Sequence, residues 1–296
     1  MEASKRSAYI KATIAVSAWG ASFIATKVAL RDVSPVTVVW LRFAIGILII
    51  GYAVWARKQL SLPSIRELFY FAVLGAIGIT FHQWLQSTGL VTSEATTTAW
   101  IVAATPIFIA LLGFIVLKEN LGKNTGVGLV LATVGVILVV TKGDLASLAI
   151  GKFGTSGDLL ILLSAPNWAV FSVLSRRGLQ RHPAAMMMFY VMLFGWLLTG
   201  VQFIAGSGIE EIALLTVEGW MGVGFLGVFS TGIAYIFWYD ALQVLEATQT
   251  GVFLYLEPLV AIVVAAVVLA EALVPAALLG GTFILAGVWL VNRQTA

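Results

Sequence analysis

The sequence contains no cysteine and very few charged residues. Only 10% of its 296 residues are Asp, Glu, Lys or Arg, whereas 60% are hydrophobic, and the mean hydropathy is +1.01. In soluble domains about a quarter of the residues are charged. So few polar side chains cannot cover a globule in water, which excludes a soluble protein. The absence of cysteine excludes disulfide bonds and leaves the redox compartment undetermined.

The motifs of common catalytic and metal centres are also missing. The sequence has no G-x-x-x-x-G-K-[ST], so ATP hydrolysis by this chain is not expected, and it has no H-E-x-x-H, G-x-S-x-G or Cys/His cluster. A lipid-modifying enzyme would need paired acids or a His/Asp cluster near one membrane face, and neither is present. We therefore predict a protein that is not an enzyme and that has no metal, no cofactor and no nucleic-acid partner.

Long apolar runs fill most of the chain. A spanning helix needs about 20 mainly apolar residues, and an open sheet edge in lipid would leave backbone groups unpaired. No cleavage site follows the basic pair Lys5 and Arg6, so the first run is predicted to be a retained helix and not a signal peptide. The ten predicted spans are residues 9–30, 35–56, 68–90, 95–117, 124–140, 158–176, 184–204, 219–239, 247–269 and 275–292.

The distribution of Lys and Arg predicts the orientation of the chain. With a cytoplasmic N-terminus, twelve of these residues flank the spans on the cytoplasmic side and four on the outer side. Cytoplasmic flanks of membrane proteins are enriched in Lys and Arg. We therefore predict a multi-pass protein of the bacterial inner (plasma) membrane, in contact with the lipid bilayer, with both termini cytoplasmic and an even number of helices.

Part of the sequence is repeated. Residues 89–140 align without a gap with residues 241–292, and 15 of these 52 positions carry the same residue. Shared apolar composition explains matches of Leu with Leu, but not two Glu pairs and a Pro pair in one register. These pairs are Glu94/Glu246, Glu119/Glu271 and Pro106/Pro258. We expect Glu119 and Glu271 to bind helix ends or loops near the membrane surface.

The repeat predicts two units of five helices, residues 1–145 and 146–296. Five is an odd number, so the second unit must enter the membrane from the opposite side, and the two repeats are inverted. Inverted repeats are typical of secondary transporters, whose substrate site lies near the membrane midplane between the repeats. One unit in two orientations allows two packings of similar energy, which is the basis of alternating access.

Four stretches carry a family resemblance: SAWGASFIATKVAL (17–30), SPVTVVWLRF (34–43), TPIFIALLGFIVLKENL (105–121) and EPLVAIVVAAVVLAEAL (257–273). With five plus five helices, the chain resembles the EamA type of the drug/metabolite transporter superfamily over nearly its whole length. The resemblance implies export of amino acids or other small metabolites. The tryptophan-rich spans are most similar to aromatic amino-acid exporters of the YddG kind.

Polar side chains inside predicted spans are costly in lipid and are candidates for function. They are Arg42, His82, Gln83, Gln86, Asn167 and Glu257. By their positions along the helices, Arg42, His82 and Glu257 lie within roughly 5 Å of one layer. His82 and Gln86 are four residues apart and share one helix face. We predict that this face lines the transport pathway.

Glu257 and Arg42 each have two interpretations. Glu257 could couple transport to protons or bind a substrate amine, or it could be a structural carboxylate paired with Arg42 or a hydroxyl. Arg42 could bind a substrate carboxylate through two hydrogen bonds. It could instead tie helix ends together near the outer face.

Aromatic residues supply the remaining candidates for substrate contact. Trp100 and Trp168 lie a turn or two inside their spans, and Tyr235, Tyr239 and Tyr255 belong to later spans of the second unit. An aromatic, weakly polar cavity would bind apolar and aromatic side chains by stacking and by burial of their surface. A few polar groups would then hold the amino and carboxyl ends.

Two prolines near the middle of their spans predict kinks. Pro106 and Pro258 each remove a hydrogen bond from the helix ladder. Equivalent kinks in an inverted pair of helices would suit gating. The alternative is a static bend that curves the helices around a cavity.

These features together predict a monomeric secondary transporter that exports amino acids, aromatic and other neutral ones included, or related small metabolites. A proton-coupled multidrug exporter of the same fold is the alternative. A channel is disfavoured because channels display rings of polar residues around an assembly axis.

Overall fold

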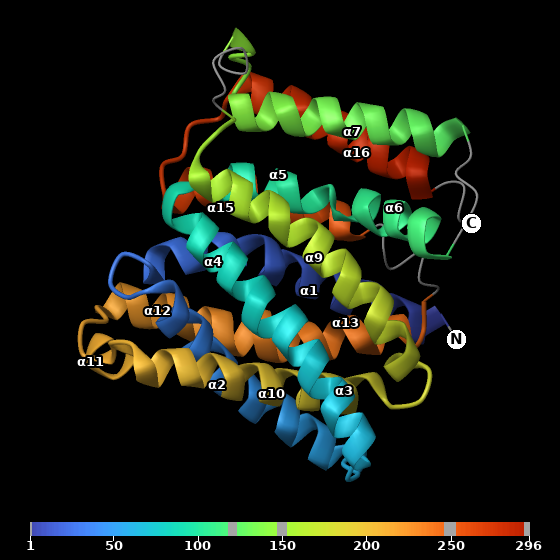
Figure 1. Ribbon diagram of the computed structural model, residues 1–296, viewed down its shortest axis with the longest axis vertical. Helices are drawn as coiled ribbons and strands as arrows, with labels where there is room; N and C mark the ends of the chain where they lie inside the picture. The colour runs from blue at the N-terminus through green and yellow to red at the C-terminus, as the bar shows by residue number, and fades with distance from the viewer. Residues whose placement is uncertain (1, 118–122, 147–152, 246–252, 293–296) are drawn as a thin grey trace.

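The chain folds into a bundle of helices (Figure 1). The computed structural model describes residues 2–117, 123–146, 153–245 and 253–292, and within these ranges there is no strand. The expected all-helical class is confirmed for this part of the chain. The elements are α1 (Glu2–Ala29), α2 (Pro35–Ala56), α3 (Ile65–Gly75), η1 (Ala76–Phe81), α4 (His82–Thr92), α5 (Ala95–Ala103), α6 (Thr105–Leu117), α7 (Lys123–Thr141), α9 (Ser156–Leu179), α10 (Ala184–Ala205), α11 (Gly208–Ile212), α12 (Val217–Phe225), η2 (Leu226–Ile233), α13 (Ala234–Leu242), η3 (Phe253–Tyr255), α15 (Leu256–Val268) and α16 (Pro275–Asn292).

Six of these helical segments are long and apolar enough to cross a membrane. They are Lys5–Ala29, Pro35–Ala56, Ile65–Thr92, Ser156–Leu179, Ala184–Ala205 and Val217–Leu242. Shorter apolar helices cover Ala95–Ile109, Gly126–Thr141, Phe253–Val268 and Pro275–Leu290. Both sets fall on the expected spans, while the crossing of the membrane by the shorter helices stays a prediction. Glu119 and Glu246, which belong to the sequence repeat, lie outside the described residues.

Helices from the two halves of the sequence are interleaved. α1 packs against α12, α13 and α15, α2 packs against η2 and α10, and α4 packs against α9. α7 and α16 form a close pair at one edge of the bundle (Figure 1). Glycines allow the two backbones of this pair to approach, since a Cβ added at Gly135 would lie 2.5 Å from the carbonyl oxygen of Gly280. Such small-residue contacts are a common way of packing helices in membranes.

Each of two long helical rods contains a π-helical segment. η1 joins α3 to α4, and η2 joins α12 to α13. The sequence repeat aligns residue 89 with residue 241. In the same alignment η1 corresponds to residues 228–233, which lie inside η2. A π turn holds more residues than an α turn and often occurs at a functional site. The hydropathy pattern did not predict these segments, and both lead directly into the wall of the cavity described below.

Both predicted proline positions lie in the first turn of an α-helix. α5 ends at Ala103 and α6 begins at Thr105, immediately before Pro106. In the other half, the 3-10 turn η3 precedes α15, which begins at Leu256, two residues before Pro258. Proline has no backbone N–H to donate, so the ladder cannot run through it unchanged. Any movement at these breaks stays a prediction.

The contact between α1 and α15 depends on a glycine. A Cβ added at Gly20 would lie 2.5 Å from the backbone oxygen of Glu257 and 3.0 Å from the Cβ of Val260. We expect Gly20→Ala to push the two helices apart, at a cost of about 1–3 kcal/mol, and so to lower the Tm of the purified protein in detergent. Gly224→Ala is the matched control, because a Cβ there meets nothing within 4 Å. Equal Tm values for the two variants would contradict this close contact.

Candidate functional site

A cavity of about 270 Å³ lies inside the bundle, and residues from both halves of the sequence line it. Its polar wall residues are Ser22, Arg42, His82, Gln83, Gln86, Thr105, Ser230 and Glu257. Its aromatic wall residues are Trp19, Phe23, Trp168, Phe171, Tyr235, Trp238, Tyr239 and Tyr255. Val102, Ala103, Pro106, Ile109, Met188 and Leu254 complete the lining. A concave, largely apolar site with a few convergent polar groups is the usual form of a small-molecule site.

The cavity brings together most of the residues that the sequence singled out. Those in its wall are Arg42, His82, Gln86, Pro106, Trp168, Tyr235, Tyr239, Tyr255 and Glu257. Trp100 and Pro258 are not among the lining residues. The three ionisable residues of the predicted layer all line one space, as their common layer predicts, while their depth in the membrane stays a prediction. The part that each one plays in transport stays a prediction.

Arg42 is held in the cavity wall by neutral groups. Its side chain donates from Nε to Thr231 Oγ1 at 3.1 Å, from Nη1 to Gln83 Oε1 at 3.1 Å, and from Nη2 to Ser230 Oγ at 3.2 Å. The residue is only 7% exposed. The guanidinium therefore connects α2 to α4 and η2 in the interior of the bundle. The sequence had offered another interpretation, in which Arg42 ties helix ends together near the outer face.

Glu257 lies in the first turn of α15 and also faces the cavity. None of the ion pairs among the described residues involves Glu257 or Arg42. The structure therefore does not contain the direct Arg42–Glu257 ion pair that the sequence offered as an alternative. Both residues line one cavity without forming an ion pair.

His82 packs against aromatic rings in the wall of the cavity. Its ring centroid lies 4.7 Å from that of Trp168, which in turn lies 4.8 Å from the ring of Phe171. His82 is 5% exposed, and its Nδ1 has no hydrogen-bond partner among the described residues. A buried polar atom without a partner is costly unless a ligand or water satisfies it.

A second aromatic group stands on α1 and α13. The ring of Trp19 lies 5.5 Å from Tyr235 in an edge-on arrangement and 5.2 Å from Trp238, and Tyr235 lies 6.4 Å from Tyr239. The indole N–H of Trp19 donates to the backbone oxygen of Ser230 at 3.0 Å, which fixes the ring. Rigid aromatic surfaces of this kind bind apolar side chains with little loss of conformational entropy.

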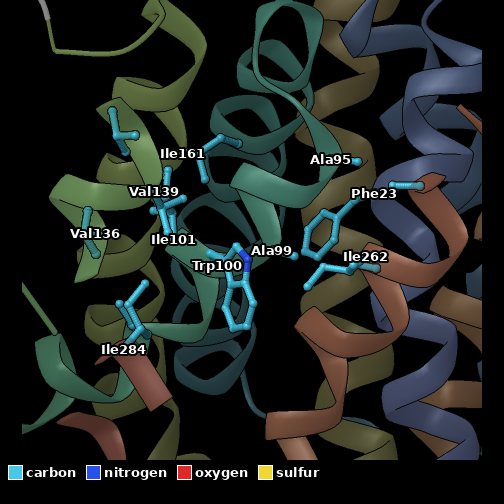
Figure 2. Close-up of a cluster of buried hydrophobic side chains, with 14 of the residues drawn as sticks. Phe23, Ala95, Ala99, Trp100, Ile101, Val136, Val139, Ile161, Ile262 and Ile284 are labelled. Carbon is cyan, nitrogen blue, oxygen red and sulfur yellow. The ribbon is translucent and has the colours of Figure 1, made fainter. Parts of the chain in front are cut away.

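Trp100 was predicted as a substrate contact, but the structure places it in the apolar core. It is 2% exposed and is surrounded by apolar side chains, among them Phe23 and Ile262 (Figure 2). Its ring rests on Gly281 of α16, where the absence of a side chain leaves room for the indole. The sequence did not show on which side of α5 Trp100 lies. Pro258 is likewise buried and packs away from the cavity.

Eight polar or aromatic lining residues were not predicted as substrate contacts: Ser22, Gln83, Thr105, Ser230, Trp19, Phe23, Phe171 and Trp238. Gln83 was named among the polar candidates, and Trp19 and Trp238 were visible as aromatic residues in spans, but nothing assigned these three to the substrate site. Ser230 gave no signal, because a single serine in an apolar run is common. The π segments that precede Gln83 and contain Ser230 change the helical phase, so a 3.6-residue period cannot identify the face.

Polar contacts close the end of the bundle at which α5 begins. Glu271 follows α15, and its carboxylate accepts hydrogen bonds from the backbone N–H groups of Ala95 and Thr96 at 2.8 and 3.0 Å, and from Thr96 Oγ1 at 2.9 Å. Lys27 of α1 donates to the backbone oxygen of Ser93 at 2.6 Å. The expectation that Glu271 binds a helix end is confirmed.

A different network joins the helices at the opposite end, where α1 starts and α13 finishes. Asp240 of α13 binds Lys11 of α1 at 2.7 Å and Arg57, just after α2, at 2.6 Å. A third contact pairs His182 with Glu67 at 2.9 Å. The start of α1 and the last turn of α16 lie at this same end (Figure 1).

Comparisons with known proteins agree with this architecture. Residues 6–141 and 155–293 match the sequence profile of the EamA-like transporter family. An uncharacterized transporter of Archaeoglobus fulgidus is 28% identical over 281 residues, covering 93% of this chain and 94% of that protein. A relative from Streptantibioticus cattleyicolor, named "probable terminal-alkyne amino-acid exporter", is 27% identical over 282 residues, covering 95% of this chain and 92% of its own. A crystal structure at 22% identity aligns with a TM-score of 0.67 over 98% of this chain and 99% of that one, which shows a shared fold.

Proposed function

Because the chain belongs to the EamA-like transporter family, we propose that it is a secondary transporter that exports amino acids or related small metabolites. These two relatives are named as a transporter and an exporter and not as enzymes. One of them carries the name of an amino-acid exporter, and the exported class is proposed for this chain in part from that name. The proposed location is the plasma membrane.

This proposal depends mainly on the cavity wall, which combines aromatic rings with ionisable side chains. Two groups of aromatic rings, one around Trp168 and one around Trp19, stand with Arg42, His82 and Glu257 around a single space. Aromatic faces suit an apolar or aromatic side chain, and the three polar groups suit the ends of an amino acid. Its volume of about 270 Å³ is of the size of a small metabolite.

Alternating access is proposed on the strength of the repeat. Matching residues and π segments recur at one offset in the two halves. We propose that residues 1–145 and 146–296 form two inverted units of five spans each, with both termini cytoplasmic. Rocking of one unit against the other would then expose the cavity to each side in turn. Pro106 and Pro258 are the proposed sites of bending.

Proton coupling is a second candidate property, and Glu257 favours it. This carboxylate faces the cavity with no counter-ion among the described residues. A pH gradient across the liposome membrane tests it directly. Exchange that responds to the gradient in the wild-type protein supports a coupled exporter of the same fold, whereas indifference to the gradient supports passive, gradient-driven export.

Counterflow in liposomes tests the function itself. Purified protein in vesicles loaded with unlabelled threonine, methionine or phenylalanine should accumulate the labelled form of the same amino acid from outside. Only a carrier with an alternating site produces such transient accumulation, since a channel lets the label equilibrate without exceeding the outside concentration. Vesicles without protein are the control for leakage. No exchange of any of the three amino acids, in vesicles that hold folded protein, would refute the proposal.

A further inference from the structure

Arg42 is the one cationic side chain among the described residues that line the cavity. A guanidinium has five N–H donors. Three of its nitrogens donate to Thr231, Gln83 and Ser230, and each of these acceptors is an uncharged oxygen. The three bonds fix the position of the group and leave further N–H donors without a partner in the described part of the chain. The charge itself is therefore held in place but not neutralised.

Among the described residues, three other cationic side chains form ion pairs with carboxylates, which Arg42 does not. Lys11 and Arg57 share the carboxylate of Asp240, and Lys142 binds Glu94 at 2.5 Å. These three are partly exposed, whereas Arg42 is 7% exposed and has no carboxylate within ion-pair distance among the described residues. A charge at membrane depth without a partner is expensive, and such residues mark binding or conduction paths. The described residues therefore supply no counter-ion to Arg42.

The surrounding backbone is shaped to present this guanidinium. Ser230 and Thr231 are consecutive residues of the π segment η2, and both accept from Arg42. Gly46, one turn further along α2, has no side chain, and the methyl group of Thr231 occupies the space that a Cβ would need. Because α2 and η2 approach this closely, the two hydroxyl groups reach the arginine. The wide π turn and the glycine therefore both help to position Arg42 beside Ser230 and Thr231, and we call these three residues the cationic corner of the cavity.

We propose that this corner binds the carboxylate of the transported substrate, with Arg42 as the counter-ion. The inference rests on the proposed transport function and names the substrate class, which is a small carboxylate-bearing metabolite. Arg is suited to this task because its planar donors match the two oxygens of a carboxylate. Glu257 lines the same cavity as Arg42 and forms no ion pair with it. An amino group on the substrate therefore has a negative charge to face, and its side chain has the aromatic walls.

Competition against counterflow tests this orientation. The labelled amino acid is the one of threonine, methionine and phenylalanine that exchanges fastest, and the competitors are its unlabelled form, its methyl ester and its decarboxylated amine. For the wild-type protein we expect the free acid to compete about tenfold or more better than the ester and the amine, since a hydrogen bond between charged groups contributes more than a neutral one. Inorganic phosphate is the fourth competitor, and it should compete weakly.

Variants at the corner separate charge from geometry. Arg42→Gln should weaken competition by the free acid about tenfold while leaving that of the amine unchanged, so that the preference for the acid disappears. Arg42→Lys keeps the charge without the planar pair of donors and should retain part of the preference. The Tm of each variant in detergent shows whether it is folded. Arg57→Gln, whose cation lies outside the cavity, is the matched control and should keep the wild-type preference.

The outcomes are distinct for the two proposals. No exchange of any amino acid by the folded wild-type protein refutes the transport function. Exchange in which acid, ester and amine compete equally refutes only the carboxylate site, and this result needs no variant, so it stands even if Arg42→Gln does not fold. A folded Arg42→Gln protein that keeps the acid preference also refutes it. Phosphate that competes better than the free acid would assign the corner to phosphate and overturn the inference.

Discussion

Replacing Trp168 by alanine should raise the KM for amino-acid exchange by about tenfold or more, because the variant loses both a stacking surface and a large buried area. Trp168 stands between His82 and Phe171, with ring centroids 4.7 and 4.8 Å away. Its truncation also removes the surface that orients the imidazole. The concentration dependence of counterflow in liposomes gives the KM, and the Tm in detergent shows whether the variant is folded.

Two tryptophan variants serve as controls for this effect. Trp220 lies on α12, is 45% exposed and does not line the cavity, so Trp220→Ala should leave the KM unchanged. Trp100→Phe changes an indole in the apolar core and should affect Tm more than KM. Trp168→Phe keeps an aromatic face and should fall between wild type and Trp168→Ala. A normal KM in a folded Trp168→Ala protein would remove this ring from the substrate surface.

Replacing Glu271 by alanine should lower the Tm of the purified protein by several degrees. The carboxylate accepts three hydrogen bonds, two of them from backbone N–H groups in the first turn of α5. Hydrogen bonds to a charged group contribute about 1.5–3 kcal/mol each to stability, and a negative charge at a helix N-terminus adds to this. Its loss frees the loop after α15 from α5, and these two elements come from different halves of the sequence.

Two further variants show whether the loss of Tm comes from the hydrogen bonds of Glu271 to the start of α5, which we call the cap, or from the loss of a surface charge. Glu271→Gln keeps one acceptor oxygen and should recover part of the stability. Glu210→Ala removes an exposed carboxylate from α11 and should leave the Tm within about 1 °C of wild type, because surface substitutions cost little. Thermal unfolding in one detergent and one buffer measures all three variants. If Glu271→Ala and Glu210→Ala unfold at the same temperature, the cap contributes nothing measurable.

Much of the fold could be predicted from hydropathy and repetition. The helices over the predicted spans follow from apolar length, and the helix starts near Pro106 and Pro258 follow from residues that cannot continue a helix ladder. Counting residues predicted a common layer for Arg42, His82 and Glu257, because the rise per residue of a helix is fixed, and the three residues line one cavity. Their depth in the membrane and the crossing by the shorter helices stay predictions.

The faces of the helices were less predictable, for a physical reason. In a membrane protein both the lipid-facing and the core-facing side of a helix are apolar, so hydrophobic periodicity gives little information about rotation. Trp100 and Trp168 looked equivalent in the sequence, but Gly281 has no side chain and leaves room for the ring of Trp100 in the core. The π segments add a second difficulty, because they change the helical phase just before Gln83 and Tyr235. Only the packed structure shows which residues share the cavity.

The shared carboxylate of Asp240 has a consequence for biogenesis. In the proposed topology Lys11 and Arg57 are among the basic residues that keep their flanks in the cytoplasm during insertion. After folding, the same two side chains bind Asp240 and join α1 and α2 to α13. In that topology each of the two would act twice, first as a signal read by the insertion machinery and later as part of the finished bundle. Asp240 is translated long after both, so the basic pair gains this partner only when α13 arrives.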